Sequence, residues 1–315
     1  MGFEALLGNE RLKENLRSSI ARGRLSHFYL ISGPEGSGKR TLAQLLAAAA
    51  VCREQEKPCL RCAACRKVLS GNHPDVITVA DPEHKNVPVK LVRAYREDAF
   101  IRPNEAERKV YIFPQPLGLD GQNSLLKLLE EPPAYGVFLL LTDNPEKLLP
   151  TVRSRCTPLA LTALPKQILY GQLKSAFPQA AEEDLQGAVA RSGGYLGQAK
   201  ALLEAGDAVS PQTQSFAEAY AVRNAAGILQ VLAPMEKWKR DALIPELNQW
   251  AVLLQDALVF RAGSSAVSRQ ARQLSAARSG RELMAALAAV QKAMQYAQGN
   301  VSPAAVCGYL VWALR

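Results

Sequence analysis

Short apolar segments alternate with amphipathic segments along the first half of the chain. Five of the apolar segments are rich in aliphatic and aromatic side chains, as is typical of buried strands. They cover residues 28–32, 76–79, 110–113, 137–141 and 159–161. Helix-like stretches lie between them, and apolar residues such as Leu42, Leu45, Leu46 and Ala49 share one helical face. This alternation predicts a parallel sheet that helices cover on both faces.

After about residue 162 the strand-like segments stop, and helical periodicity continues to the end of the chain. Apolar residues recur there at spacings of three and four, in one stretch at Leu243, Leu247, Trp250, Leu254 and Leu258 and in another at Leu283, Ala286, Leu287, Val290 and Met294. Glycines at 193–194 and the stretch 206–211 interrupt the pattern. We therefore expect an α/β domain over residues 1–161, a small helical domain over 162–207 and a helical C-terminal domain over 208–315.

The composition is that of a folded chain. With 48% hydrophobic and 21% charged residues among 315, the sequence has enough apolar side chains to bury a core, which excludes extensive disorder. Its uninterrupted apolar stretches fall far short of the roughly 20 residues that a membrane-spanning helix needs. The N-terminus has no basic segment followed by an apolar run. We expect a soluble cytoplasmic protein without a signal peptide and without a membrane partner.

The net charge of +9 does not by itself indicate a DNA-binding surface. Residues 1–160 carry a net +5 and residues 161–315 a net +4, so the excess is spread over both halves. A protein that reads DNA sequence usually gathers basic residues on one face or tail. Charge therefore gives little support to direct, sequence-specific DNA binding.

The glycine-rich segment after the first strand is typical of a phosphate-binding loop. Residues 33–39 read Gly-Pro-Glu-Gly-Ser-Gly-Lys and precede a helix. Glycines let consecutive backbone N–H groups face phosphate oxygens, and a lysine at this point reaches the outer phosphates. The candidate nucleotide-binding residues are Gly33, Gly36, Gly38, Lys39 and Thr41. The alternative is an ordinary glycine turn.

Two parts that ATP hydrolysis needs are missing from this segment and its surroundings. The serine or threonine that holds Mg²⁺ should follow Lys39, but Arg40 stands there and Thr41 is displaced by one residue. The acidic pair that should close a later strand is also absent, because residues 109–113 run into Pro-Gln-Pro. We expect that this chain does not hydrolyse ATP on its own. Whether Lys39 still holds ATP or ADP stays open.

Four of the six cysteines lie within fourteen residues. Cys52, Cys59, Cys62 and Cys65 are separated by six, two and two residues. Four thiolates fill the coordination sphere of Zn²⁺ and leave no position for a reacting water, so the set predicts a structural zinc site in an insert at about 52–67. Reduced surface cysteines or an iron–sulfur cluster are the alternatives. Cys307 is expected to be a buried small hydrophobic residue.

A combination of motifs resembles a known family. The motifs are Leu-Ser-His-Phe-Tyr-Leu at 25–30, the four-cysteine insert after the first helix, His-Pro-Asp at 73–75, Asn-Ser-Leu-Leu-Lys-Leu-Leu-Glu-Glu-Pro-Pro at 123–133 and Ser-Arg-Cys at 154–156. Together they resemble the clamp-loader branch of the AAA+ ATPases, and within it the delta-prime subunits of bacterial DNA polymerase III. The resemblance is specific over about residues 5–205 and fainter beyond.

This resemblance implies a P-loop α/β domain with a zinc insert, a small helical lid and an all-α collar domain. It implies partners as well: the loader's ATPase subunits, its delta subunit, and the sliding clamp and primed DNA through the assembled ring. The protein would then be cytoplasmic and associated with the nucleoid and replisome. Delta-prime members are typically not motors, and a third departure agrees with this, since residues 194–197 read Gly-Tyr-Leu-Gly where ATPase members have a lid arginine.

In the resembled family the arginine of the Ser-Arg-Cys motif reaches the γ-phosphate of a neighbouring subunit. Here that role falls to Arg155, with Ser154 in the same motif, as an arginine finger acting in trans. The alternative is an arginine that only stabilises the C-terminus of a helix expected at 145–153. Glu130 and Glu131 end the preceding motif, and we interpret them as a solvated face or an interface contact.

The remaining candidates are assigned no chemistry. His27, His73 and His84 have no neighbours that suggest a nucleophilic triad. Trp238, Trp250 and Trp312 are expected in the core, with an interface as the alternative.

Three functions remain open from sequence. The first is a non-hydrolysing delta-prime clamp-loader subunit. The second is an active ATPase subunit of the gamma/tau type. The third is a zinc-containing nucleic-acid-binding protein.

Overall fold

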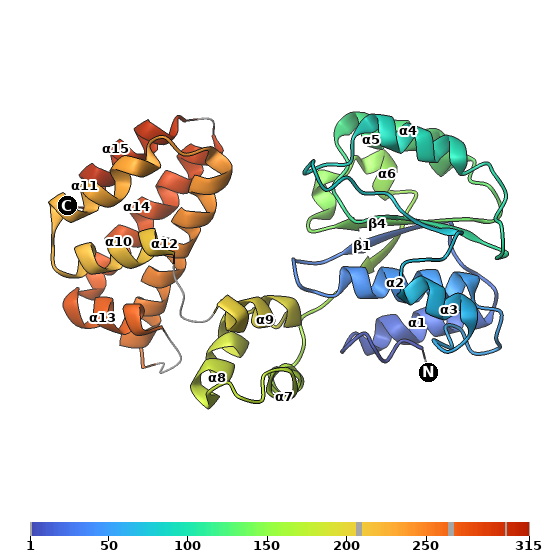
Figure 1. Ribbon diagram of the computed structural model, residues 1–315, viewed down its shortest axis with the longest axis horizontal. Coiled ribbons are helices and arrows are strands. Elements are labelled where there is room, and N and C mark those ends of the chain that lie inside the picture. Colours follow the sequence, from blue (N-terminus) through green and yellow to red (C-terminus); the bar gives the residue numbers. More distant parts are fainter. Residues whose placement is uncertain (1, 206–209, 264–267, 300, 315) are drawn as a thin grey trace. The chain divides into compact units, whose positions relative to one another are not determined.

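Five parallel strands form a single sheet in the computed structural model (Figure 1). The structure describes residues 2–205, 210–263, 268–299 and 301–314. The strands are β1 (Phe28–Ser32), β2 (Val76–Thr78), β3 (Lys109–Phe113), β4 (Gly136–Thr142) and β5 (Thr157–Ala160). Their order across the sheet is β2-β3-β4-β1-β5, and each neighbouring pair is parallel. The predicted parallel sheet is confirmed.

The strands that the sequence located most accurately are those buried on both faces. All residues of β1 and β3 are buried, so nearly every position carries an apolar side chain and the strand ends are sharp in the sequence. The edge strand β5 begins at Thr157, before the expected residue 159. The sequence did not indicate this start because three of the four strand residues are exposed. Exposed positions at an edge carry no hydrophobic signal.

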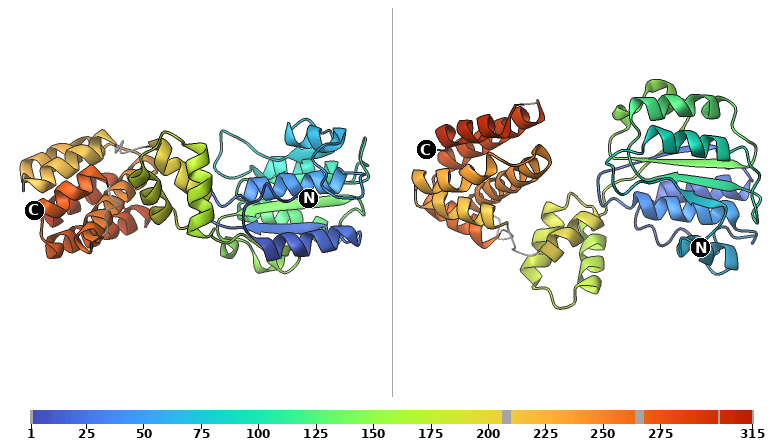
Figure 2. Two further views of the ribbon diagram at one scale, coloured as in Figure 1. Left: turned by 90° about the horizontal axis from the view of Figure 1, so that it is seen from below. Right: turned by 45° about the horizontal axis from the view of Figure 1, so that its top comes forward.

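Helices cover both faces of the sheet, as Figures 1 and 2 show. One face is covered by α1 (Glu10–Ala21), α2 (Lys39–Val51) and α3 (Ala63–Leu69), and the other by α4 (Val89–Asp98), α5 (Leu119–Glu130), the 3₁₀ turn η1 (Pro145–Lys147) and α6 (Pro150–Arg153). Each face has its own apolar core, one centred on α2 and the other on α5. This three-layer arrangement and the helices in the described residues after β5 confirm the expected fold class.

Three aromatic rings fix the middle of the sheet. Phe138 on β4 lies directly opposite Phe28 on β1 and Tyr111 on β3. The ring of Phe138 stacks on both neighbours, with centroids 4.5 Å and 5.2 Å apart. Stacked cross-strand aromatics stabilise strand pairing beyond the area that they bury. The Tyr111 hydroxyl donates to Asp98 Oδ2 at 2.6 Å, which ties the stack to the end of α4.

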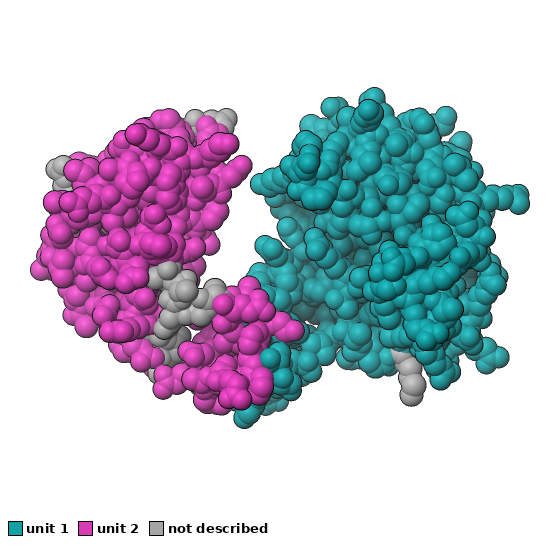
Figure 3. Space-filling model, in the orientation of Figure 1, with its two compact units in different colours: residues 1–176, 192–199 teal, residues 177–191, 200–315 magenta. Residues whose placement is uncertain are grey.

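The chain divides into two compact units, coloured separately in Figure 3. The first comprises residues 1–176 and 192–199, and the second comprises residues 177–191 and 200–315. The boundary expected at 207–208 lies outside the described residues. The division into three domains therefore stays a prediction.

The described part of the chain after β5 is helical. Its helices are α7 (Lys166–Ala176), α8 (Glu182–Arg191), α9 (Leu196–Ala205), α10 (Pro211–Ala221), α11 (Ala225–Met235), α12 (Arg240–Arg261), α13 (Arg269–Ala277), α14 (Gly280–Gln298) and α15 (Pro303–Ala313). Within the described ranges, none of the helices combines the length and the apolar character needed to cross a membrane.

The core of the second unit contains only some of the expected aromatic residues. Trp250 is fully buried, with its ring 4.1 Å from that of Phe216. Cys307 is also buried, as expected. Trp312 is 71% exposed, so the expectation that it belongs to the core is wrong. Helix α15 is apolar on every side, and its periodicity could not show which face is buried.

We predict that Phe138→Ala lowers the free energy of unfolding of the first unit by about 3–5 kcal/mol, because the side chain is 1% exposed and stacks on two rings. Denaturant titration followed by circular dichroism measures this. Phe100→Ala is the control: Phe100 is 56% exposed, so the change should stay within about 0.5 kcal/mol. Equal losses for the two variants would contradict the assignment of Phe138 to the sheet's core.

Candidate functional site

The glycine loop joins the end of β1 to the start of α2. Gly36 and Gly38 have φ angles of 75° and 97°, a left-handed region that favours glycine. Gly197 and Gln198, at the start of α9, pack against the loop. The Gly197 N–H donates to the Gly36 carbonyl at 3.0 Å, and a Cβ on Gly36 would lie 2.5 Å from the Gln198 nitrogen. A side chain at either Gly36 or Gly197 would clash with the other segment, so both positions need glycine.

Lys39 is bound by groups of its own chain. Its Nζ donates to the carbonyls of Gly33 and Pro34 at 2.6 Å and 2.9 Å and to Asp143 Oδ1 at 2.5 Å. An ammonium group has three N–H donors, and these three contacts use them all. The Asp143 carboxylate is therefore the anionic partner of the loop lysine. The Lys39 side chain is 14% exposed and Asp143 is 64% exposed, so this pair lies at the surface end of the site.

Sequence reasoning missed Asp143, although the sheet explains it. Ser32 of β1 is paired with Thr142 of β4, so the residues that follow the two strands emerge side by side. The expected strands at 28–32 and 137–141, placed next to each other, could have indicated this neighbour. Arg40 is exposed, and Thr41 is partly buried in the first turn of α2.

The segment after β3 carries a structural glutamine. Gln115 Oε1 accepts from the Asp81 N–H, and its Nε2 donates to the carbonyls of Asp81 and His84, each at 2.8 Å. The carboxamide thereby fastens the turn at 81–84 to the end of β3. A cavity of about 40 Å³ lies beside it, bordered by Gln115, Asp143 and Asn144. It is far smaller than the roughly 300–1,000 Å³ of typical ligand pockets.

Arg155 and the glycine loop lie at opposite ends of the parallel strands. The loop follows β1, whereas Arg155 precedes β5, and the two strands are parallel with Tyr29 paired to Thr157. Four strand residues at about 3.3 Å each separate the two ends by about 13 Å. Arg155 and the chain's own glycine loop therefore lie at opposite ends of the strands.

The guanidinium of Arg155 has two anchors. Its Nη1 donates to the Thr151 carbonyl and its Nη2 to Glu130 Oε1, both at 3.1 Å. The Ser154 hydroxyl donates to the same Thr151 carbonyl at 3.3 Å. Sequence reasoning interpreted Glu130 only as a solvated or interface residue, because nothing local distinguishes it from Glu131.

The helix expected at 145–153 is interrupted. The structure has the 3₁₀ turn η1 and, after a break, the short helix α6. Pro150 explains the break, because proline lacks an N–H donor and is favoured in the first turn of a helix. The nearby Arg153 pairs with Glu146 instead of with Glu130.

The four cysteines of the insert come together as expected. Their sulfur atoms all lie within 4.8 Å of one another, and the Cys52–Cys62 and Cys59–Cys65 pairs are 4.0 Å and 3.9 Å apart. Zinc–sulfur bonds of about 2.3 Å in a tetrahedron place sulfurs about 3.8 Å apart. The donor set and spacing therefore fit a closed tetrahedral zinc site, which would tie the end of α2 to α3.

Backbone N–H groups favour thiolates in part of this cluster. Burial raises the pKa of the Cys59 thiol, but hydrogen bonds from the N–H groups of Arg61 and Cys62 outweigh it and lower that pKa to about 7. Burial raises the pKa of the Cys65 thiol. A metal ion must displace the remaining thiol protons, so binding would strengthen as pH rises.

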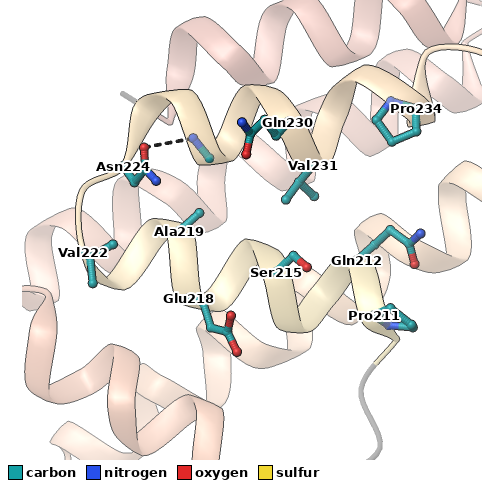
Figure 4. A pocket seen from close by; sticks show the side chains of 11 residues that line it. Pro211, Gln212, Ser215, Glu218, Ala219, Val222, Asn224, Gln230, Val231 and Pro234 are labelled. Carbon is teal, nitrogen blue, oxygen red and sulfur yellow. Dashed lines mark hydrogen bonds between the residues drawn. The ribbon is translucent and has the colours of Figure 1, made fainter.

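The second unit contains a separate groove between α10 and α11 (Figure 4). Its volume is about 530 Å³, and small or uncharged side chains such as Ser215, Ala219 and Val231 line it. Of the described residues along this groove, Glu218 alone is ionisable, and its Oε1 accepts from Gln214 at 3.0 Å. The lining offers no pair of groups for acid–base or nucleophilic chemistry.

A family model described as "DNA polymerase III, delta subunit" matches residues 8–165. The chain belongs to this family. It is 38% identical over 162 residues to the delta' subunit of DNA polymerase III from Bacillus subtilis and 34% identical over 175 residues to the tau subunit of the same organism. The matches cover 50% and 54% of this chain.

The chain spans only part of these relatives. The matched region is 49% of the B. subtilis delta' subunit and 31% of the tau subunit. A delta' subunit from Pseudomonas aeruginosa is 34% identical over 55% of this chain and 54% of its own length. A crystal structure of a gamma subunit-related protein from Thermotoga maritima covers 96% of this chain and 98% of its own, with a TM-score of 0.50 at 17% identity, and shows the fold alone.

We predict that the purified protein carries about one zinc ion per chain and that Cys62→Ser abolishes stoichiometric binding, because three thiolates leave the tetrahedron open. Elemental analysis after dialysis measures this. Cys307→Ala is the control, since Cys307 is buried in the other unit. Iron, or no metal, in the wild-type protein would contradict the zinc prediction.

We predict that Asp143→Asn raises the affinity for ADP by roughly tenfold or more. The neutral side chain no longer competes with phosphate for Lys39 and no longer repels it. Titration of a fluorescent ADP analogue measures the change. Asp120→Asn removes the same charge from an exposed position in the same unit and should leave the affinity unchanged. No gain for Asp143→Asn would mean that other features close the loop.

Proposed function

We propose that the chain is a delta-prime-type subunit of a DNA polymerase III clamp loader. In this role it does not hydrolyse ATP itself, and it supplies Arg155 to the ATP site of a neighbouring subunit. The observation that carries the proposal is the opposite placement of two charged groups. All three N–H donors of Lys39 are used within its own chain, whereas Arg155 is exposed at the other end of the strands.

The placement of Arg155 supports action on another chain. An arginine finger has to reach the γ-phosphate of a bound nucleotide, and Arg155 lies at the opposite end of the strands from this chain's phosphate-type glycine loop. Its guanidinium is planar, permanently charged and still partly open to solvent. Such a group can stabilise the charge that develops on phosphate oxygens during transfer.

The state of the chain's own loop supports the absence of turnover. Arg40 stands where a hydroxyl should hold magnesium, and Pro114 and Gln115 stand where the acidic pair should be. Gln115 holds the turn at 81–84, since both N–H donors of its carboxamide are used there and its oxygen accepts one hydrogen bond from that turn. Hydrolysis would require the Lys39–Asp143 pair to open as well.

The rest of the chain fits the assembly role. We assign residues 162–207 to a lid and residues 208–315 to a collar through which the subunits associate. The partners would be the loader's ATPase subunits and its delta subunit, and the complex would act on the sliding clamp and primed DNA in the cytoplasm. Zinc in the cysteine insert would be structural.

An active gamma/tau-type ATPase is the second candidate. The similarity to the B. subtilis tau subunit, 34% over 175 residues, favours it. It requires Mg²⁺ to be held without a hydroxyl at position 40, where Arg40 stands. A nucleic-acid-binding protein receives less support, because the family match covers the region of the glycine loop.

We predict that Arg155→Ala lowers clamp- and DNA-stimulated ATP hydrolysis by a reconstituted loader roughly fivefold or more, because one ATP site loses its trans cation. Lys39→Ala should leave the rate within about twofold, since Lys39 serves its own chain only. Steady-state phosphate release measures both.

Arg153→Ala serves as the control, because Arg153 is a neighbouring basic residue that pairs with Glu146. Loss of activity with Lys39→Ala and none with Arg155→Ala would reject the proposal and favour the gamma/tau-type ATPase.

A further inference from the structure

The contact between Glu130 and Arg155 joins the ends of two helices. Glu130 is the last residue of α5, and Arg155 follows the end of α6 by two residues. Glu130 Oε1 accepts from Arg155 Nη2 at 3.1 Å. We propose that Glu130 is a positioning residue, which holds the Arg155 guanidinium ready for the neighbouring subunit's phosphate. This inference rests on the proposed function of Arg155.

The pair contributes little to folding stability. The Arg155 and Glu130 side chains are 39% and 56% exposed, and ion pairs at that exposure add almost nothing to stability. Its effect is on orientation instead. An arginine side chain has four rotatable bonds, and a finger that samples many rotamers loses that freedom when it engages phosphate. Anchoring it beforehand removes part of this loss from the reaction barrier.

Two anchors define the plane of the guanidinium. The Thr151 carbonyl takes a hydrogen bond from Nη1, and Glu130 takes one from Nη2. A guanidinium has five N–H donors, so three remain for phosphate oxygens. Glu130 therefore orients the guanidinium and leaves N–H donors free for phosphate. Lys39 differs, because its three donors are all occupied.

The chain supplies a matched control next to Glu130. Glu131 has the same side chain and is exposed. Among the residues that the structure describes, it forms no ion pair with Arg155, because α5 ends at Glu130 and Glu131 has left the helical conformation with φ −129°. A general effect of removing a carboxylate from this surface would appear equally at both positions.

The experiment compares Glu130→Ala, Glu130→Gln and Glu131→Ala in the reconstituted loader, each with Arg155 and with Arg155→Ala. Steady-state hydrolysis with clamp and primed DNA gives kcat and the KM for ATP. We expect Glu130→Ala to lower kcat roughly threefold or more with KM within about twofold, because a finger acts in the transition state. Glu130→Gln keeps an acceptor oxygen and should recover part of the loss. Glu131→Ala should resemble the wild type.

The double variant separates positioning from a structural role. With Arg155→Ala already present, Glu130→Ala should cause no further loss, since it has no guanidinium left to orient. An equal loss in both backgrounds, an equal loss for Glu131→Ala, or a higher rate for Glu130→Ala would overturn the inference. If Arg155→Ala itself leaves hydrolysis unchanged, the proposed function fails and the positioning role fails with it. An effect of Arg155→Ala without any effect of Glu130→Ala overturns the inference alone.

Discussion

The parallel pairing of β1 with β4 is the constraint on which the chemistry of this chain depends. Parallel strands end at a common edge, so whatever follows them meets there. Ser32 is paired with Thr142, which places the glycine loop beside Asp143. The stacked rings of Phe28, Phe138 and Tyr111 keep this register, because a shift by one residue would turn each ring to the other face of the sheet.

The same register gives the loop an anion from its own chain. A lysine at a phosphate loop needs a partner of opposite charge, and here the partner is Asp143, 104 residues away in sequence. The Gly36–Gly197 contact then closes the loop from the side of α9. Each feature alone is compatible with a nucleotide site. Together they hold the loop through contacts within its own chain, with Lys39 bound by Asp143 and Gly36 packed against Gly197.

The sequence was informative where the signal is local. The buried strands and the four cysteines were located because apolar runs and tight spacing are visible within a few residues. The partners of Lys39 and Arg155 were not, because each lies on another element and only the packing selects it. Glu130 and Glu131 are equivalent in sequence, and the end of α5 decides between them. Trp312 was misplaced because an entirely apolar helix has no periodicity to read.

The exposure of each ion pair separates fixed charges from those that can change partner. Lys109 is buried, and its Nζ pairs with Asp98 at 2.9 Å, so removing Asp98 would leave a buried ammonium without its charge partner. Glu130 and Arg155 pair at the surface, where water replaces either partner at little cost. A group that must engage phosphate on another molecule has to be held by contacts of the second kind, because a deeply buried partner could not release it.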